Sequence, residues 1–194
     1  MKIGLLESLI NSIIIIVAIV LIGLIMMLIQ RLIIKIFASF SSPEFANLFI
    51  NRLTFIGVVH HELSHALFAI LTGAKITSIH LFKPKDDTLG SVGYCTRGPF
   101  LLRGLQAIFA SIAPVICGSI SCFLIFKYLL FVTIWKTIIF GFVFICIFIH
   151  MDLSPQDIKS AITGLPAIII ILTTFLFAFQ FDRTIFINSI IDRI

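Results

Sequence analysis

The sequence predicts an all-α polytopic membrane protein with about five transmembrane segments and a small β-hairpin inserted after the second. Composition is the first reason. Of the 194 residues, 60% are hydrophobic and 12% are charged, and the mean hydropathy of +1.20 lies far above the soluble range. The second reason is a series of nearly uncharged apolar runs, because about 20 helical residues cross ~30 Å of hydrocarbon.

Five apolar segments are expected to form helices, since a helix satisfies its own backbone hydrogen bonds in lipid. The first continues into Gln30 and Arg31 without a small-residue cleavage site, which predicts that residues 1–35 are a retained transmembrane anchor. Pro114 lies within the third segment and predicts a kink or a break there. The segments are residues 9–30, 53–72, 99–126, 130–150 and 165–181.

Two connecting segments have a different character. Residues 39–52 combine Ser, Pro and Asn with scattered apolar residues, a pattern typical of a loop or a short interfacial helix. Residues 74–98 alternate β-branched and polar residues around His80 and contain Pro84 and Gly90, so they are expected to form the β-hairpin. The whole chain is predicted to be one membrane-embedded domain of residues 1–194, with its core at about residues 53–181.

The charges favour a lipid bilayer as partner and exclude nucleic acid. The net charge is +5, but the basic residues are not interleaved with aromatic residues as on a nucleic-acid surface. Counting Lys and Arg on alternate sides of five spans gives seven on each side, so the positive-inside rule assigns no orientation. The cysteines lack metal-ligand spacing and are expected to be small apolar core residues; they are Cys95, Cys117, Cys122 and Cys146.

The second apolar segment contains an HExxH motif. His61 and His65 are four residues apart, so on a helix they project from one face and can bind one metal ion, for which zinc is expected. Glu62 is rotated ~100° from His61 and suits a general base that is not a ligand. Chance could explain this pattern on a solvated helix, but ionisable side chains in a membrane segment are costly and usually functional. His60 is off the ligand face and is expected to line the cavity or to cap a neighbour rather than to bind metal.

A third ligand is needed, and the stretch HMDLSPQD at residues 150–157 offers three candidates. They are His150, Asp152 and Asp157. Ser154 and Pro155 predict the N-cap and first residue of a new helix, with Asp157 completing a capping box as its third residue. That structural role is compatible with ligation, because a carboxylate at a helix N-terminus stays ionised.

Together these features resemble the site-2 protease family of intramembrane zinc metalloproteases, and more closely its short bacterial relatives that lack a PDZ domain. The resemblance covers roughly residues 55–165 and includes Thr72-Gly73 after the motif helix, ASIAPVICG at 110–118 and LSPQDIKSAITGL at 153–165. It implies one zinc ion held by His61, His65 and Asp157, with Glu62 as general base.

The implied activity is peptide-bond hydrolysis in a membrane protein or peptide substrate, in a multi-pass protein of the bacterial cell membrane. Better-known members carry the aspartate in an Asn-Pro…Asp-Gly segment, whereas Ile158 follows Asp157 here, so Asp152 is kept as the reserve ligand. Water is expected to reach the site near Gly57, Ser64 and Pro114.

The sequence is compatible with three further interpretations. Residues 75–97 can clamp substrate by strand addition or serve as a structural loop. A catalytically silent metal-binding membrane protein that binds or chaperones a partner would keep the histidines without needing Glu62. A transporter ranks last, because a conducting path needs ionisable residues on several helices and the first, third and fifth segments have almost none.

Overall fold

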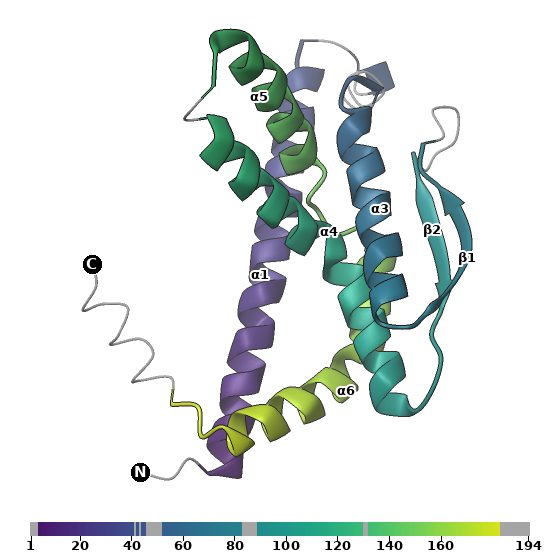
Figure 1. Ribbon diagram of the computed structural model, residues 1–194, viewed down its shortest axis with the longest axis vertical. Coiled ribbons are helices and arrows are strands. Elements are labelled where there is room, and N and C mark those ends of the chain that lie inside the picture. The colour runs from purple at the N-terminus through teal and green to yellow at the C-terminus, as the bar shows by residue number, and fades with distance from the viewer. Residues whose placement is uncertain are drawn as a thin grey trace.

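The computed structural model describes residues 4–40, 42, 44–45, 52–82, 89–129 and 132–182. This part of the chain is mostly helical with one small antiparallel sheet, as the composition predicted (Figure 1). The elements in chain order are α1 (Leu5–Ala38), α3 (Phe55–Leu71), β1 (Lys75–His80), β2 (Ser91–Cys95), α4 (Phe100–Leu129), α5 (Ile134–Ile149) and α6 (Pro155–Ala178).

Three helices are long and apolar enough to cross a membrane. They are α1, α4 and α6, whose qualifying stretches have 29, 30 and 24 residues. Helices α3 and α5 are apolar but have only 17 and 16 residues, so five full-length spans are not evident from length. The last helix begins at Pro155, as the predicted N-cap at Ser154 indicated, and it continues through Gly164 and Pro166 into the apolar segment predicted at residues 165–181.

The β-hairpin predicted after the motif helix is confirmed. Strands β1 and β2 pair antiparallel from Lys75 opposite Cys95 to His80 opposite Ser91, with an irregularity between Ile76 and Ser78. Both strands pack against α3. The turn of the hairpin and most of residues 39–52, predicted as a loop or interfacial helix, lie outside the described residues.

Helix α4 organises the packing, since it contacts α3, α5 and α6. Its contact with α6 is very close because the facing residues are small. A Cβ on Gly104 would overlap Ala167, and one on Gly164 would lie 2.6 Å from the Gly104 carbonyl oxygen. Small residues allow helix backbones to approach in this way within membranes. This contact fixes the position of α6, whose first turn carries Asp157.

Helix α3 approaches α5 just as closely at Gly57. A Cβ there would overlap the backbone carbonyl of Cys146 and lie 2.5 Å from the His150 ring, so backbone would have to move. We expect Gly57→Ala to destabilise the fold by about 1–3 kcal/mol, the usual cost of overpacking. Thermal unfolding in detergent measures this loss. Gly141→Ala is the control, because a Cβ on Gly141 meets nothing within 4 Å; equal melting temperatures for the two variants would contradict the close contact.

Candidate metal centre

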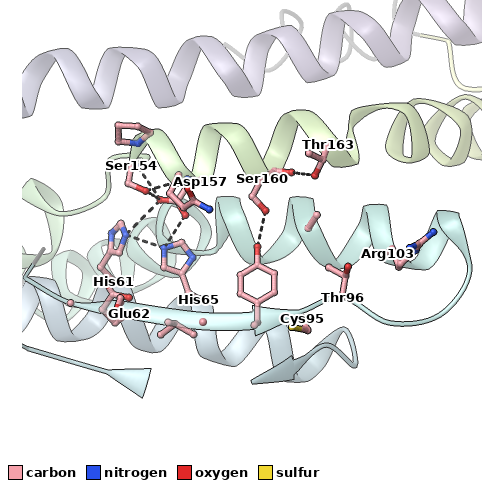
Figure 2. A pocket seen from close by; sticks show the side chains of 18 of the residues that line it. His61, Glu62, His65, Cys95, Thr96, Arg103, Ser154, Asp157, Ser160 and Thr163 are labelled. Carbon is pink, nitrogen blue, oxygen red and sulfur yellow. Dashed lines mark hydrogen bonds and ion pairs between the residues drawn. The ribbon is translucent and has the colours of Figure 1, made fainter. Parts of the chain in front are cut away.

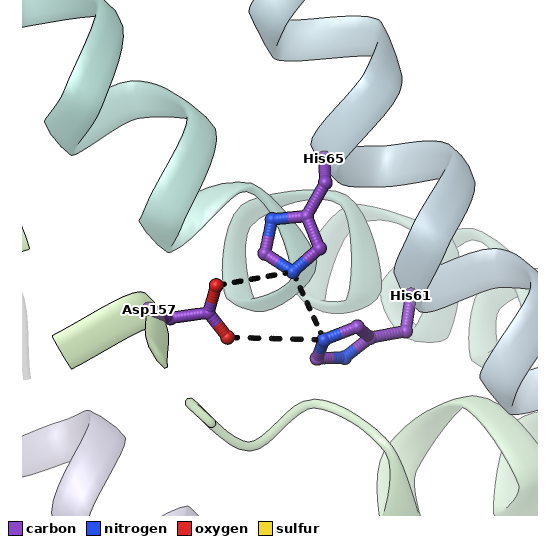
Figure 3. Close-up of side chains that lie close together, drawn as sticks. All are labelled: His61, His65 and Asp157. Atoms are coloured by element: carbon purple, nitrogen blue, oxygen red, sulfur yellow. Dashed lines mark hydrogen bonds and ion pairs between the residues drawn. The ribbon is translucent and has the colours of Figure 1, made fainter. Parts of the chain in front are cut away.

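Three predicted ligands, from two helices, meet at one point. The Nε2 atoms of His61 and His65 lie 3.0 Å apart (Figure 3). Asp157, from the first turn of α6, places its carboxylate oxygens 3.4 Å from His65 Nε2 and 4.0 Å from His61 Nε2. One ligand atom from each residue therefore fits within 4.8 Å of the others, and this group can hold a metal ion.

The other ring nitrogen of each histidine is engaged by a backbone carbonyl. His61 Nδ1 lies 2.8 Å from the carbonyl oxygen of His150, and His65 Nδ1 lies 2.7 Å from that of Ala110. A carbonyl only accepts hydrogen bonds, so each Nδ1 carries the proton and donates it. Both neutral rings are thereby held in the tautomer whose Nε2 has a free lone pair, the usual outer-shell arrangement of metal-ligating histidine.

The resulting geometry favours a cation between the three side chains. Two Nε2 lone pairs face each other and also face a carboxylate, which is electrostatically unfavourable unless a proton or metal ion lies among them. Neutral imidazole and ionised carboxylate are the forms that bind metal. Two ligand atoms that each lie about 2.0–2.1 Å from a tetrahedral metal are about 3.3 Å from one another. The two Nε2 atoms are 3.0 Å apart, and His65 Nε2 is 3.4 Å from the nearer Asp157 oxygen, so both distances are close to this value. The residues thus fit a metal ion with little rearrangement.

Both carbonyl acceptors are free because of where helices are interrupted. In α4 the carbonyl of Ala110 would normally accept from the residue four positions later, but that residue is Pro114, which has no N–H. His150 follows the last residue of α5, where carbonyls also lack partners within the helix. The helix continues through Pro114 without the break that was predicted as one alternative. The proline instead releases the acceptor that orients His65.

Pro114→Ala tests this role. Alanine restores an N–H that competes for the Ala110 carbonyl, so we expect metal affinity to fall about 10- to 100-fold, the usual cost of losing an outer-shell partner. The melting temperature of the metal-free protein should not fall, because alanine suits a helix interior better than proline. Titration against a competing chelator measures the affinity, and an unchanged affinity would contradict the proposed orienting role.

Asp157 combines ligand geometry with a helix cap. Its backbone N–H donates to Ser154 Oγ at 3.2 Å, and its carboxylate accepts from the Ser154 N–H at 2.9 Å and hydroxyl at 2.6 Å. The predicted capping box is therefore confirmed. The reserve candidate Asp152 is not part of the three-residue group, and burial raises the pKa of its carboxyl above the usual range.

The two remaining histidines near the motif face elsewhere. His60 Nε2 lies 3.0 Å from Ser121 Oγ on α4, so it contacts a neighbouring helix as expected. His150 Nε2 lies 2.8 Å from Thr54 Oγ1. Burial, followed by the effect of His61, lowers the pKa of His150 to about 4, so this candidate is neutral and supplies its carbonyl rather than its ring.

Glu62 lies beside the group without joining it. The residue is only 8% exposed and, among the described residues, its carboxylate has no hydrogen-bond or ion-pair partner. Gly90, just before β2, lies directly against it: a Cβ there would be 2.6 Å from Glu62 Cγ and 3.0 Å from Oε1. The start of β2 therefore covers the carboxylate while leaving its oxygens unpaired.

A pocket of about 1090 Å³ opens next to these residues (Figure 2). Its walls come from β2, the first turns of α4 and the first turns of α6, and it includes His61, Glu62, His65 and Asp157. Gly57, Ser64 and Pro114 were predicted as places where a cavity opens. None of these residues lines the pocket, because all three are buried in helix contacts.

The chain matches no protein-family model, and no curated protein or solved structure is detectably similar to it.

Proposed function

We propose that this chain is a multi-pass integral membrane zinc metalloprotease of the site-2 type, which hydrolyses peptide bonds in membrane-embedded or membrane-adjacent substrates. The observation that carries the proposal is the juxtaposition of two imidazoles with free Nε2 atoms, a carboxylate and a buried unpaired glutamate in one pocket. The resemblance of the sequence to the site-2 protease family supports the same activity.

The distribution of polar and apolar residues supports a membrane location. Large apolar side chains are exposed along the helices, including Ile22 on α1, Phe123 on α4 and Trp135 on α5 at 54%, 64% and 74%. Polar side chains are buried alongside the apolar core, and Thr173 donates to Ser12 between α6 and α1. Exposed apolar surface of this extent is typical of a chain whose helices contact lipid.

Zinc is the metal that the donor set favours, because two imidazoles and a carboxylate with one open position form a catalytic zinc arrangement. When bound, zinc supplies a Lewis acid that activates water and polarises the scissile carbonyl. His61 and His65 would hold it through Nε2, and Asp157 through a carboxylate oxygen. Ser154 keeps that carboxylate oriented by its two hydrogen bonds.

Glu62 is the group that moves protons in this proposal. Its carboxylate lines the same pocket and has no partner among the described residues, so it can accept a proton from the attacking water and deliver it to the leaving amine. Burial by Gly90 removes bulk water from one side of the carboxylate. This placement favours hydrolysis over the alternative of a silent metal-binding protein, which has no use for an unpaired carboxylate facing the pocket.

Strand β2 offers a way to hold an extended substrate. The described sheet has two strands, and β2 pairs with β1 on one side while residues Ser91–Cys95 line the pocket on the other. A peptide can add to such an edge by main-chain hydrogen bonds. A helical substrate must first unwind there, because its amides are otherwise bonded within its own helix.

Co-expression with single-span membrane proteins tests the proposal. Membranes containing the wild-type chain should accumulate a shortened reporter, and membranes containing Glu62→Gln should not. Equal shortening by the two forms would assign the cleavage to another protease and remove the support for this function.

A further inference from the structure

The pocket extends well beyond the three ligands. Along α6 it is lined by Asp157, Ser160 and Thr163, which are spaced three residues apart on one face. Six residues of helix rise about 9 Å, so the pocket runs at least that far from the metal centre. Figure 2 shows the ligands at one end and Arg103 at the other, with Ser160 between them.

Arg103 gives the far end a positive charge. It lies in the first turn of α4, and it is the only Lys or Arg among the described residues that line the pocket. It forms no ion pair with a carboxylate of the described chain, and the first turn of α4 contains no acidic residue. The acidic lining residues, Glu62 and Asp157, both lie at the opposite end. No carboxylate of the pocket therefore neutralises this guanidinium.

We propose that Arg103 is a specificity-determining residue that binds a carboxylate of the peptide substrate three or more residues from the scissile bond. The inference rests on the proposed protease function. An extended peptide advances about 3.3 Å per residue, so at least three residues are needed to cover the ~9 Å or more that the pocket extends from the metal centre. A guanidinium binds carboxylate with paired, charge-assisted hydrogen bonds. The carboxylate comes from the substrate's C-terminus or from an Asp or Glu side chain.

The middle of the pocket suits such a peptide. Tyr94 from β2 and Ser160 from α6 share a hydrogen bond of 2.9 Å, which joins the two walls of the pocket between its two ends. Gly93, next to Tyr94, also lines the pocket with its backbone, and a Cβ there would meet the Ser78 and Thr77 hydroxyls of β1 at 2.5 Å and 2.7 Å. The strand edge thus fixes the peptide's main chain, while Arg103 fixes its register.

Peptide binding to zinc-loaded Glu62→Gln in detergent tests the inference without requiring cleavage. The probes are one labelled apolar peptide with a free C-terminus, the same peptide amidated, and amidated versions with a single Glu moved along the sequence. We expect about fivefold tighter binding with the recognised carboxylate than without it. Tight binding of the free acid identifies the C-terminus, and tight binding of one Glu peptide identifies a side chain.

Variants assign the preference to its residue. Adding Arg103→Gln should abolish the preference, Arg103→Lys should keep part of it, and Arg97→Gln, which removes an equal charge outside the pocket lining, should keep all of it. Equal affinities for all peptides, or a preference that survives Arg103→Gln, would overturn the inference. If the preference is found but wild-type protein cleaves none of these peptides, the Arg103 site stands and the protease function fails.

Discussion

Asp157→Ala is expected to lose its zinc. The carboxylate is the only non-imidazole member of the three-residue group, so its removal leaves two ligands. Loss of an outer-shell partner alone costs 10- to 100-fold in affinity, and loss of a ligand should cost about 100-fold or more. Metal analysis after dialysis, followed by titration against a chelator, measures the loss.

Two controls separate ligation from other effects at this position. Asp152→Ala removes the reserve carboxylate and should keep full zinc, because Asp152 lies outside the group. Ser154→Ala removes the cap hydroxyl but leaves the carboxylate, so it should lower stability by about 1 kcal/mol and lower zinc affinity less than Asp157→Ala does. Full zinc in Asp157→Ala, with zinc lost from Asp152→Ala, would transfer the third-ligand role to Asp152.

Glu62→Gln should abolish turnover without removing the metal. A general base contributes typically 10²–10⁴-fold, so we expect kcat on a peptide substrate to fall by about that factor. Zinc content should stay the same, since Glu62 is not one of the three ligand residues. Glu7→Gln is the matched control, because it makes the same change in the first turn of α1 away from the pocket. A kcat within twofold of wild type would remove Glu62 from the mechanism.

The histidine pair and the helix cap of the site were predictable from the sequence, because residues close together in the chain determine both. The four-residue spacing of His61 and His65 places both rings on one face of α3, and the Ser154 cap follows from four consecutive residues. The helical class and the hairpin were predictable for the same reason, since apolar runs and alternating residues are local signals.

The approach of Asp157 to the two histidines could not be predicted from the sequence. Asp157 lies 92 residues after His65 (157 minus 65), and it reaches the histidines because Gly104 and Gly164 let α4 and α6 approach closely. Residues 150–157 contain three candidates for the third ligand, and the sequence does not show how far each of them lies from the motif histidines. Tertiary contact alone decides among them.

The outer-shell acceptors and the pocket were missed for a related reason. A proline signals a free carbonyl four residues earlier, so Ala110 could have been identified as an unsatisfied acceptor from Pro114. Which side chain uses that carbonyl depends on how α3 packs against α4. The pocket was expected within the helices, but it formed between the hairpin and α6, and sequence patterns carry no information on that arrangement.

Mass spectrometry of a single-span reporter in proteoliposomes tests the central claim most directly. The purified, zinc-loaded wild-type chain should generate new termini within or beside the apolar segment of the reporter. Glu62→Gln, carrying the same zinc, should leave the reporter intact. An intact reporter with the zinc-loaded wild type, or identical new termini with Glu62→Gln, would contradict the assignment of this pocket as a protease site.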